Sequence, residues 1–199
     1  MFSQLLLLSA SLAATVPLAA AAPSRVSGSR IPSHTTSDPR TTHTVAVGRA
    51  GQLIFDPDNI VAEVGSIVEF HFLPRNHSVV EASFDNPCQP RDDSAPGSRA
   101  TFYSDFFPVQ PNPDGSLPQS PEVFQIEIQD TNPIWFYCAQ NNGRHCQSGM
   151  VGAINQNFDS PQNLAAFRRA AAAVPGDSGV LPAVQGGQRI PNPNPNSGV

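Results

Sequence analysis

The sequence predicts an all-β protein, a sandwich of seven to eight short strands followed by one short helix. Three observations support this fold class. The 199 residues include 21 prolines and 14 glycines, which favour turns, and only 14% of the residues are charged. Apolar and polar side chains alternate over several short segments, which is the period of a half-buried strand. Turn residues separate these segments, as they do in sandwiches and barrels.

The predicted strands fall into two groups, one in the first third of the domain and one in its last third. The clearest is 66–73, where β-branched and aromatic residues alternate with Glu69 and His71. Turns at 48–51 and 56–59 separate the first three strands. In chain order, the predicted strands are residues 42–47, 53–55, 60–62, 66–73, 122–129, 133–137 and 150–154.

Proline-rich residues 84–121 interrupt the strand pattern and predict a long irregular connection inside the domain. We therefore assign residues 41–158 to one sandwich domain and 159–173 to a C-terminal helix. The remaining residues, 174–199, are rich in proline, glycine and asparagine and predict a disordered tail.

The predicted helix begins with a polar cap and a proline in its first turn. Asp159 or Ser160 is the expected N-cap, and the alanines that follow supply helix propensity. Leu164 and Phe167 are expected to rest on the sandwich.

The N-terminus has the pattern of a secretory signal. Residues 1–22 combine a leucine-rich apolar run with small residues before Pro23. A retained membrane anchor is the alternative, but Pro17 breaks the run and no arginine cluster follows closely. Residues 23–40 then form a disordered leader, and the C-terminus lacks the hydrophobic tail of a GPI signal. The mature protein is expected to be secreted, with the cell wall as a candidate location.

The distribution of charge excludes one class of partner. The formal net charge is -5, and residues 41–158 contain five arginines against thirteen acidic residues. Nucleic-acid binding requires a basic surface that neutralises phosphates. We therefore expect no nucleic-acid partner.

The chain contains three cysteines, Cys88, Cys138 and Cys146. In an oxidising compartment two of them should pair, which leaves one thiol over. The count alone does not say which two pair. A free extracellular thiol is a liability unless it is buried or bound to a metal, so the odd cysteine is the first indication of a metal site.

The segment 138–150, between two predicted strands, carries metal-binding groups. It offers the thiol of Cys138, the imidazole of His145 and the thioether of Met150. Copper prefers soft sulfur together with imidazole, and the blue-copper pattern is two histidines, one cysteine and a weak axial methionine. His77 follows the clearest strand, where it can supply the second imidazole at the same end of a sandwich.

At this point the sequence resembles the cupredoxins, in particular the phytocyanin branch and the secreted fungal cupredoxin-like proteins. The resemblance covers about residues 42–157. It rests on Asn76-His77-Ser78-Val79, Phe84, Cys88, Phe136-Tyr137-Cys138 and His145-Cys146-Gln147-Ser148-Gly149-Met150, and Gly48, Phe55-Asp56-Pro57, Gly65 and Val68-Glu69-Phe70 fit it as well.

The resemblance implies a Greek-key sandwich with one type 1 copper ion and a disulfide between Cys88 and Cys146. Six residues separate Cys138 from His145, which is more than this family typically has. The longer loop either bulges outward and leaves the ligands in place, or it relaxes and weakens the site. The implied copper ligands are His77, Cys138, His145 and Met150.

Simpler interpretations remain for single residues. Cys138 could instead form a disulfide, and a lone histidine is more often a surface or hydrogen-bonded residue than a ligand. His71 is expected to have a structural role in its strand, His43 lies on another strand, and His34 lies in the leader. Asn76 begins a glycosylation sequon, although a glycan there would crowd the site.

Four protein ligands leave a metal no open position for a substrate, and closed sites serve structure or electron transfer. The expected function is therefore outer-sphere electron transfer through an exposed edge of His145, or extracellular copper binding, rather than enzymatic catalysis. The expected partner is a small redox molecule or a secreted oxidoreductase, and the protein is expected to be a monomer. The alternative is a metal-free module of the cell wall or extracellular matrix on the same fold.

Overall fold

The computed structural model describes residues 40–195. The predicted signal segment 1–22, the leader 23–40 apart from its last residue, and residues 196–199 of the predicted tail lie outside the described residues. Within the described range, no helix has the length and apolar character needed to cross a membrane.

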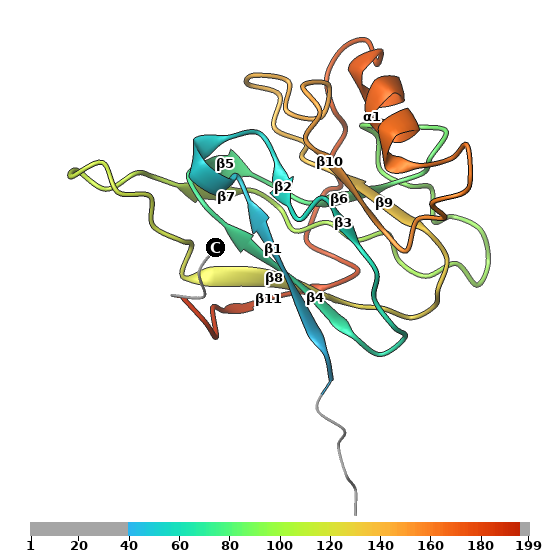
Figure 1. Cartoon of the computed structure of the whole chain (residues 1–199), viewed down its shortest axis with the longest axis horizontal. Helices are drawn as coiled ribbons and strands as arrows, with labels where there is room; N and C mark the ends of the chain where they lie inside the picture. Colours follow the sequence, from blue (N-terminus) through green and yellow to red (C-terminus); the bar gives the residue numbers. More distant parts are fainter. Residues whose placement is uncertain (1–39, 196–199) are drawn as a thin grey trace, which may run out of the picture. The chain divides into compact units, whose positions relative to one another are not determined.

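β-Strands are the main regular structure of the described chain, which also has one short helix (Figure 1). The strands are Thr42–Val47 (β1), Phe55–Asp56 (β2), Asn59–Ile60 (β3), Ile67–Phe72 (β4), Arg75–His77 (β5), Val80–Ala82 (β6), Phe107–Val109 (β7), Glu122–Glu127 (β8), Ile134–Tyr137 (β9), Val151–Ile154 (β10) and Gln188–Pro191 (β11). The helix α1 is Leu164–Ala172, and a single 3₁₀ turn, η1, covers Arg49–Gly51.

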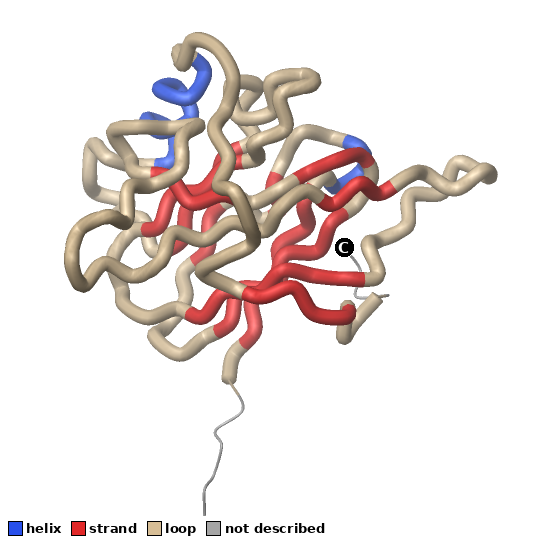
Figure 2. The backbone as a smooth tube through the Cα atoms, turned by 180° about the vertical axis from the view of Figure 1, so that it is seen from behind, coloured by secondary structure: helices blue, strands red, loops and turns tan. Residues whose placement is uncertain are grey.

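Two sheets form the sandwich, and a small third sheet lies at one end (Figure 2). The five-stranded sheet has the order β11-β8-β4-β1-β2, the four-stranded sheet has the order β3-β10-β9-β6, and β5 pairs with β7. β1 lies parallel to β4, and β8 runs antiparallel on the other side of β4. Neighbours in a sheet are often distant in the chain, so the chain crosses repeatedly between the sheets. The predicted all-β sandwich is confirmed.

The main core lies between the two large sheets and is aromatic. Phe70 on β4 meets Phe136 on β9 edge to face, with ring centroids 5.5 Å apart. Phe55 on β2 contacts Phe136 at 4.9 Å in the same geometry. These arrangements place the positive edge of one ring over the negative face of another. The inward residues of β4 are the apolar ones, and Glu69 and His71 take the other face, as the alternation predicted.

The helix α1 covers the outer side of the four-stranded sheet. Phe167 on α1 packs against Trp135 of β9 at 5.1 Å, and Leu164 is buried beside them. The predicted contact with the sandwich is confirmed, but the predicted start is wrong. The helix begins at Leu164 with Asn163 as N-cap, because the Asn163 side chain accepts a hydrogen bond from the Ala166 N–H. The residues at 159–163 form turns that lead into this cap.

The sequence pattern predicted too few strands. The described range contains eleven named strands, against seven to eight expected, and β5, β6, β7 and β11 were missed. The predicted strands 53–55 and 60–62 overlap the two-residue strands β2 and β3. β6 is buried at all three positions, so it shows no alternation, and β7 lies inside the segment predicted to be irregular.

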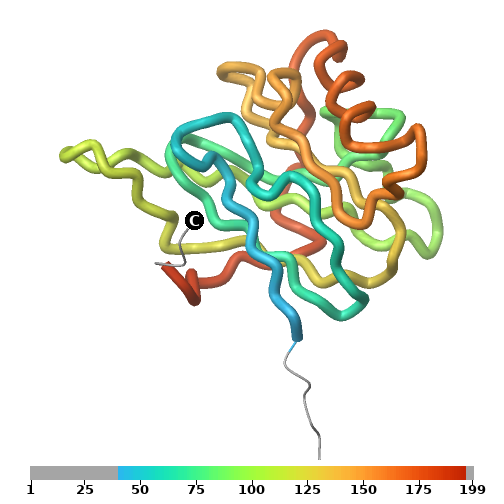
Figure 3. Tube along the Cα trace, viewed as in Figure 1, coloured from blue at the N-terminus to red at the C-terminus, as the bar shows by residue number. Residues whose placement is uncertain are grey.

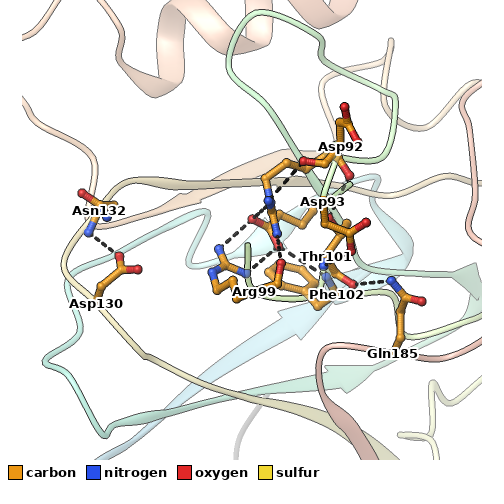
Figure 4. A network of polar contacts seen from close by, with 10 residues as sticks. Asp92, Asp93, Arg99, Thr101, Phe102, Asp130, Asn132 and Gln185 are labelled. Atoms are coloured by element: carbon orange, nitrogen blue, oxygen red, sulfur yellow. Dashed lines mark hydrogen bonds and ion pairs between the residues drawn. The ribbon is translucent and has the colours of Figure 1, made fainter. Parts of the chain in front are cut away.

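The long connection is ordered by one buried carboxylate. Glu81 on β6 accepts hydrogen bonds from Arg91 at 2.6 Å and from both terminal nitrogens of Arg99 at 2.6 and 2.7 Å. Figure 4 shows Arg99 and Thr101 within this network, where the Thr101 N–H donates to Asp93 at 2.8 Å. Polar contacts to β6 therefore hold a segment that lacks regular structure.

The predicted disorder of 174–199 is wrong for its described part. β11 pairs antiparallel with β8 at the edge of the larger sheet (Figure 3). Arg189 on β11 donates to Glu122 at 2.7 Å and lies 3.9 Å from the ring centre of Phe107. The open edge of β8 offers unpaired backbone groups, and β11 satisfies them despite its weak apolar pattern.

Candidate metal centre

His77 ends the short strand β5 and is almost fully buried. Register holds it opposite Phe107 on β7, whose ring stacks on Phe72 at 3.7 Å. Gly48 lies directly against the imidazole. Its φ of +86° favours glycine, and a Cβ there would collide with Nε2 and Cδ2 of His77. The position of the predicted ligand thus depends on two segments from different parts of the chain.

Cys138 follows β9 directly and has no exposed surface. Its backbone N–H donates to the carbonyl of Met150 at 3.1 Å. The N–H of Ser78 donates to the sulfur at 3.4 Å, and the Ser78 hydroxyl accepts from the N–H of Ala139 at 3.0 Å. Ser78 therefore couples the strand end at His77 to the cysteine and supplies the sulfur with a hydrogen-bond donor.

His145 and Met150 belong to the turn that leads from Cys138 to β10. The His145 N–H donates to Gln140 at 3.0 Å, and the Met150 N–H donates to the carbonyl of His145 at 2.9 Å. His145 is buried, with 3% of its surface exposed, and Met150 is fully buried. The hydrogen bonds between Cys138, His145 and Met150 show that these three residues lie close together despite the longer loop.

The three strong donor groups converge. Nδ1 of His145 lies 3.4 Å from the sulfur of Cys138, and Nδ1 of His77 lies 3.8 Å from it. The ligand atoms of all three residues fall within 4.8 Å of one another. In the part of the chain that the structure describes, no other group of three His, Cys, Asp or Glu side chains was found that could hold a metal ion.

Burial sets the protonation of the site. It lowers the pKa of His77 to about 4, helped by His145 and Arg75, and it lowers the pKa of His145 to about 4, again helped by Arg75. Burial also raises the pKa of the Cys138 thiol to about 11, although hydrogen bonds from nearby N–H groups oppose it. At neutral pH the imidazoles are therefore neutral and can donate lone pairs, and a metal must displace the thiol proton.

The donor chemistry fits a soft transition metal. Two neutral imidazoles and one sulfur, in a buried place beside a thioether-bearing residue, match the preference of copper for nitrogen and sulfur. No carboxylate belongs to the group, so magnesium and calcium, which take oxygen ligands, do not fit. The predicted group of His77, Cys138, His145 and Met150 is thus consistent with a copper site.

The structure also shows which cysteines pair and what His71 contacts. Cys88 and Cys146 form the disulfide, which leaves Cys138 free and buried. His71 has the structural role expected of it: Nε2 lies 2.6 Å from Glu69, and Nδ1 lies 2.9 Å from Gln119. Both of its ring nitrogens are therefore engaged away from the metal centre.

Three residues around the centre were missed by sequence reasoning. Gly48 was assigned to a turn, although its contact with His77 explains the need for glycine. Ser78 was noted only as part of a motif, and Arg75 was not singled out. Arg75 has no carboxylate partner among residues 40–195, and with Asn76 and His145 it lines a small surface pocket beside the centre. The sequon at Asn76 stays a prediction, with the side chain half-buried on β5.

Two curated fungal proteins match the sequence, and no protein-family model does. "Probable GPI-anchored cupredoxin-1" of Arthroderma benhamiae is 35% identical over 128 residues, which cover 64% of this chain and 58% of that protein. Over these residues the chain is similar to a protein named as a cupredoxin. "Extracellular serine-rich protein" of the same organism is 34% identical over 143 residues, which cover 72% of this chain and 49% of that protein. The chain therefore spans about half the length of the curated relatives it matches.

Solved structures similar to the chain include a pseudoazurin and a plastocyanin. A pseudoazurin from Sinorhizobium meliltoi is 18% identical, with a TM-score of 0.37 over 66% of this chain and 91% of that chain. A plastocyanin from Dryopteris crassirhizoma is 21% identical, with a TM-score of 0.35 over 56% of this chain and 97% of that chain.

Proposed function

We propose that this cupredoxin-like protein binds one type 1 copper ion and serves in outer-sphere electron transfer. The observation that carries the proposal is the convergence of His77, Cys138 and His145 within 4.8 Å, with Met150 buried in the same turn. Bound copper would supply a one-electron couple between Cu(II) and Cu(I). Four protein ligands would leave no open position for a substrate, so we propose no enzymatic activity.

The chain's own residues would tune such a site. His77 and His145 would bind through Nδ1, since these atoms face the Cys138 sulfur. The Ser78 N–H would stabilise negative charge on that sulfur. Burial excludes water, and the hydrogen bonds that hold each ligand limit its movement when the charge at the site changes.

The exit route differs from the one expected. We predicted an exposed edge of His145, but only 3% of this residue is exposed. The adjacent pocket is lined by polar groups and by Arg75, a cation without a carboxylate partner among the described residues. We propose that electrons pass through the rim of this pocket, and that the partner is a small, negatively charged redox molecule. A secreted oxidoreductase remains the second partner class.

An extracellular location is part of the proposal. Both relatives have names that place them outside the cell, one as GPI-anchored and one as extracellular. The disulfide between Cys88 and Cys146 supports an oxidising compartment. Whether the protein associates with the cell wall is a separate question, which fractionation of the secreted protein would answer.

Titration of the mature protein with Cu(II) tests the function. One equivalent should produce a strong blue thiolate-to-copper absorption band, and the Cys138→Ser variant should lack it. Met150→Leu should keep the band with altered intensity, because the axial thioether is a weak ligand. Absence of the band from folded wild-type protein with its disulfide intact would overturn the proposal and favour the metal-free wall or matrix module.

A further inference from the structure

The segment that follows the helix lies against the metal-binding loop. We call residues 174–179 the strap and residues 139–149 the ligand loop. Figure 3 shows the strap, drawn in red-orange after the helix, passing beside the orange ligand loop. Three side chains of the ligand loop donate hydrogen bonds to backbone carbonyls of the strap. The bonds are Arg144 to Val174 at 2.9 Å, Gln147 to Gly176 at 3.1 Å, and Asn141 to Ser178 at 3.2 Å.

The ligand loop coils, so its three donors share one side. The donors are three residues apart, and the Arg144 N–H donates to Asn141 at 3.0 Å while the Ser148 N–H donates to Arg144 at 2.8 Å. The strap bends at Gly176, whose φ is +75°, and its three carbonyls are not paired with the donors in chain order. The contact therefore joins one side of the loop to a bent segment through three separate side chains.

Asn141 forms two hydrogen bonds with the strap. Besides donating to the Ser178 carbonyl, it accepts the Ser178 N–H at 2.7 Å, so the amide pairs with the backbone in both directions. Ser178 is buried, and its hydroxyl also lies 3.4 Å from Gln147. Asn141 lies inside the six residues that separate Cys138 from His145, which is the part that departs from the family pattern.

The far end of the strap is fixed to the same region. The carbonyl of Gly179 accepts the hydroxyl of Tyr137 at 2.8 Å, and the N–H of Gly179 donates to Cys88 at 2.9 Å. Tyr137 precedes Cys138, and Cys88 is disulfide-bonded to Cys146, which follows His145. The strap thus contacts both ends of the stretch that carries the thiol and the second imidazole.

We propose that the strap is a positioning element for the metal centre, which holds the extended ligand loop so that His145 stays beside Cys138. A loop with additional residues has more conformations, and the strap restricts them. Asn141 and the strap touch neither ligand atom, so they act through the backbone of His145. The effect of the strap on metal binding rests on the proposed copper function. The hydrogen bonds by which the strap holds the ligand loop are present without a metal.

Hydrogen exchange in the metal-free, full-length mature protein tests the restraint. In Asn141→Ala, the amides of His145 and Met150 should exchange about tenfold faster or more, because two hydrogen bonds are lost. The matched control is Asn142→Ala, which changes the same residue type at the next, exposed position. Asn142 has no side-chain hydrogen bond among the described residues, so both amides should exchange as in the wild type.

Two more variants distinguish an effect of the contact with the strap from an effect of the substitution at position 141 itself. Asn141→Asp keeps the acceptor for the Ser178 N–H and loses the donor, so its exchange should lie between wild type and Asn141→Ala. Gly179→Ala displaces the strap without changing any residue of the ligand loop, because a Cβ there would collide with Gln89 and Pro90. It should accelerate exchange at His145 and Met150 as well, with the far-UV spectrum and the disulfide unchanged.

Copper-loaded protein gives the functional readout. The two strap-breaking variants, Asn141→Ala and Gly179→Ala, should retain copper but show a shifted thiolate band and a larger copper hyperfine splitting, the signature of a relaxed site. If wild-type protein forms no blue complex while the exchange results hold, the copper function fails and the strap remains a restraint of the loop. Wild-type exchange rates at His145 and Met150 in both variants would overturn the strap proposal, whatever the copper result.

Discussion

At the scale of single residues, the centre depends on two groups that are not ligands. Gly48 allows His77 to occupy its place, and Arg75 adds to the lowering of the pKa of both imidazoles, of which burial is the larger cause. Each does so from a loop or a strand end, where sequence pattern carries little information. Each can be changed without removing a ligand, so their roles are separable from metal coordination.

Gly48→Ala should displace His77. Gly48 and Gly65 share a φ of +86°, but only at position 48 would a Cβ strike the imidazole. Both alanine variants should lose about 1–2 kcal/mol of unfolding free energy from backbone strain. Only Gly48→Ala should also weaken Cu(II) binding. The loss should be about tenfold or more in the dissociation constant, because one ligand is displaced. Calorimetric titration with a competing chelator measures this, and equal copper affinity in the two variants would contradict the expected clash.

Arg75→Gln should change the preference for partner charge. At low salt, reduction of the copper protein by hexacyanoferrate(II) should slow a few-fold, because one attractive charge is lost, and the effect should fade above about 0.1 M salt. The cationic reductant hexaammineruthenium(II) should react no more slowly. Arg169→Gln on α1 is the matched control, since it removes the same charge from another arginine that makes no described ion pair. Equal slowing with both reductants would show that Arg75 acts on the site itself and not on the partner.

At the scale of elements, Glu81 connects β6 to the long loop. It is almost fully buried and faces two partly exposed guanidinium groups, those of Arg91 and Arg99. Loss of one member of a buried ion pair leaves its partners uncompensated. Glu81→Gln should therefore lower the free energy of unfolding by about 2 kcal/mol, which is less than the roughly 3–5 kcal/mol of a fully buried pair because water reaches the arginines.

A second carboxylate provides the control for Glu81. Glu122 pairs with Arg189 near the surface, where solvent screens the charges. Glu122→Gln should cost less than about 1 kcal/mol. Urea denaturation of both variants measures the difference. Similar losses would mean that burial of Glu81 contributes nothing beyond a surface pair.

At the scale of the whole molecule, the disulfide joins distant parts of the domain. Cys88 and Cys146 are separated by 58 residues, and the bond ties the long connection to the residue after His145. The double variant Cys88→Ala/Cys146→Ala should be less stable by about 4 kcal/mol, from the greater freedom of its unfolded chain. It should also bind copper more weakly, because the loop that carries His145 loses an anchor.

Thermal unfolding and copper titration test the double variant together. The wild-type protein treated with a thiol reductant is the control, and it should follow the double variant once the bond is reduced. A variant that keeps wild-type copper affinity while losing stability would show that the strap and the turn hydrogen bonds suffice to hold His145.

The predictions that succeeded came from features that are local in the chain. Alternation identified the longer strands, β1, β4 and β8, and three cysteines in an oxidising context indicated a disulfide and a free thiol. The ligand candidates were recognised because three of them lie in one segment of thirteen residues, 138–150. These signals depend on periodicity and residue type, which a sequence displays directly.

The predictions that failed concern contacts made through the backbone. β11 and the strap lie in a tail that the sequence marked as disordered, since their stability comes from carbonyls and N–H groups whose partners are distant in the chain. The helix start moved to Asn163 for a related reason, as several caps were available and packing of Phe167 on Trp135 selected one.

The sequence by itself thus determined the all-β class, the residues able to bind a metal and the presence of one cysteine without a disulfide partner. The tertiary structure decided which cysteines pair, how the extended loop between Cys138 and His145 is held, and how little of His145 reaches the surface. The physical reason is that composition and periodicity are properties of neighbouring residues. Close approach of Gly48 to His77, or of the strap to Asn141, arises only when separate segments pack together.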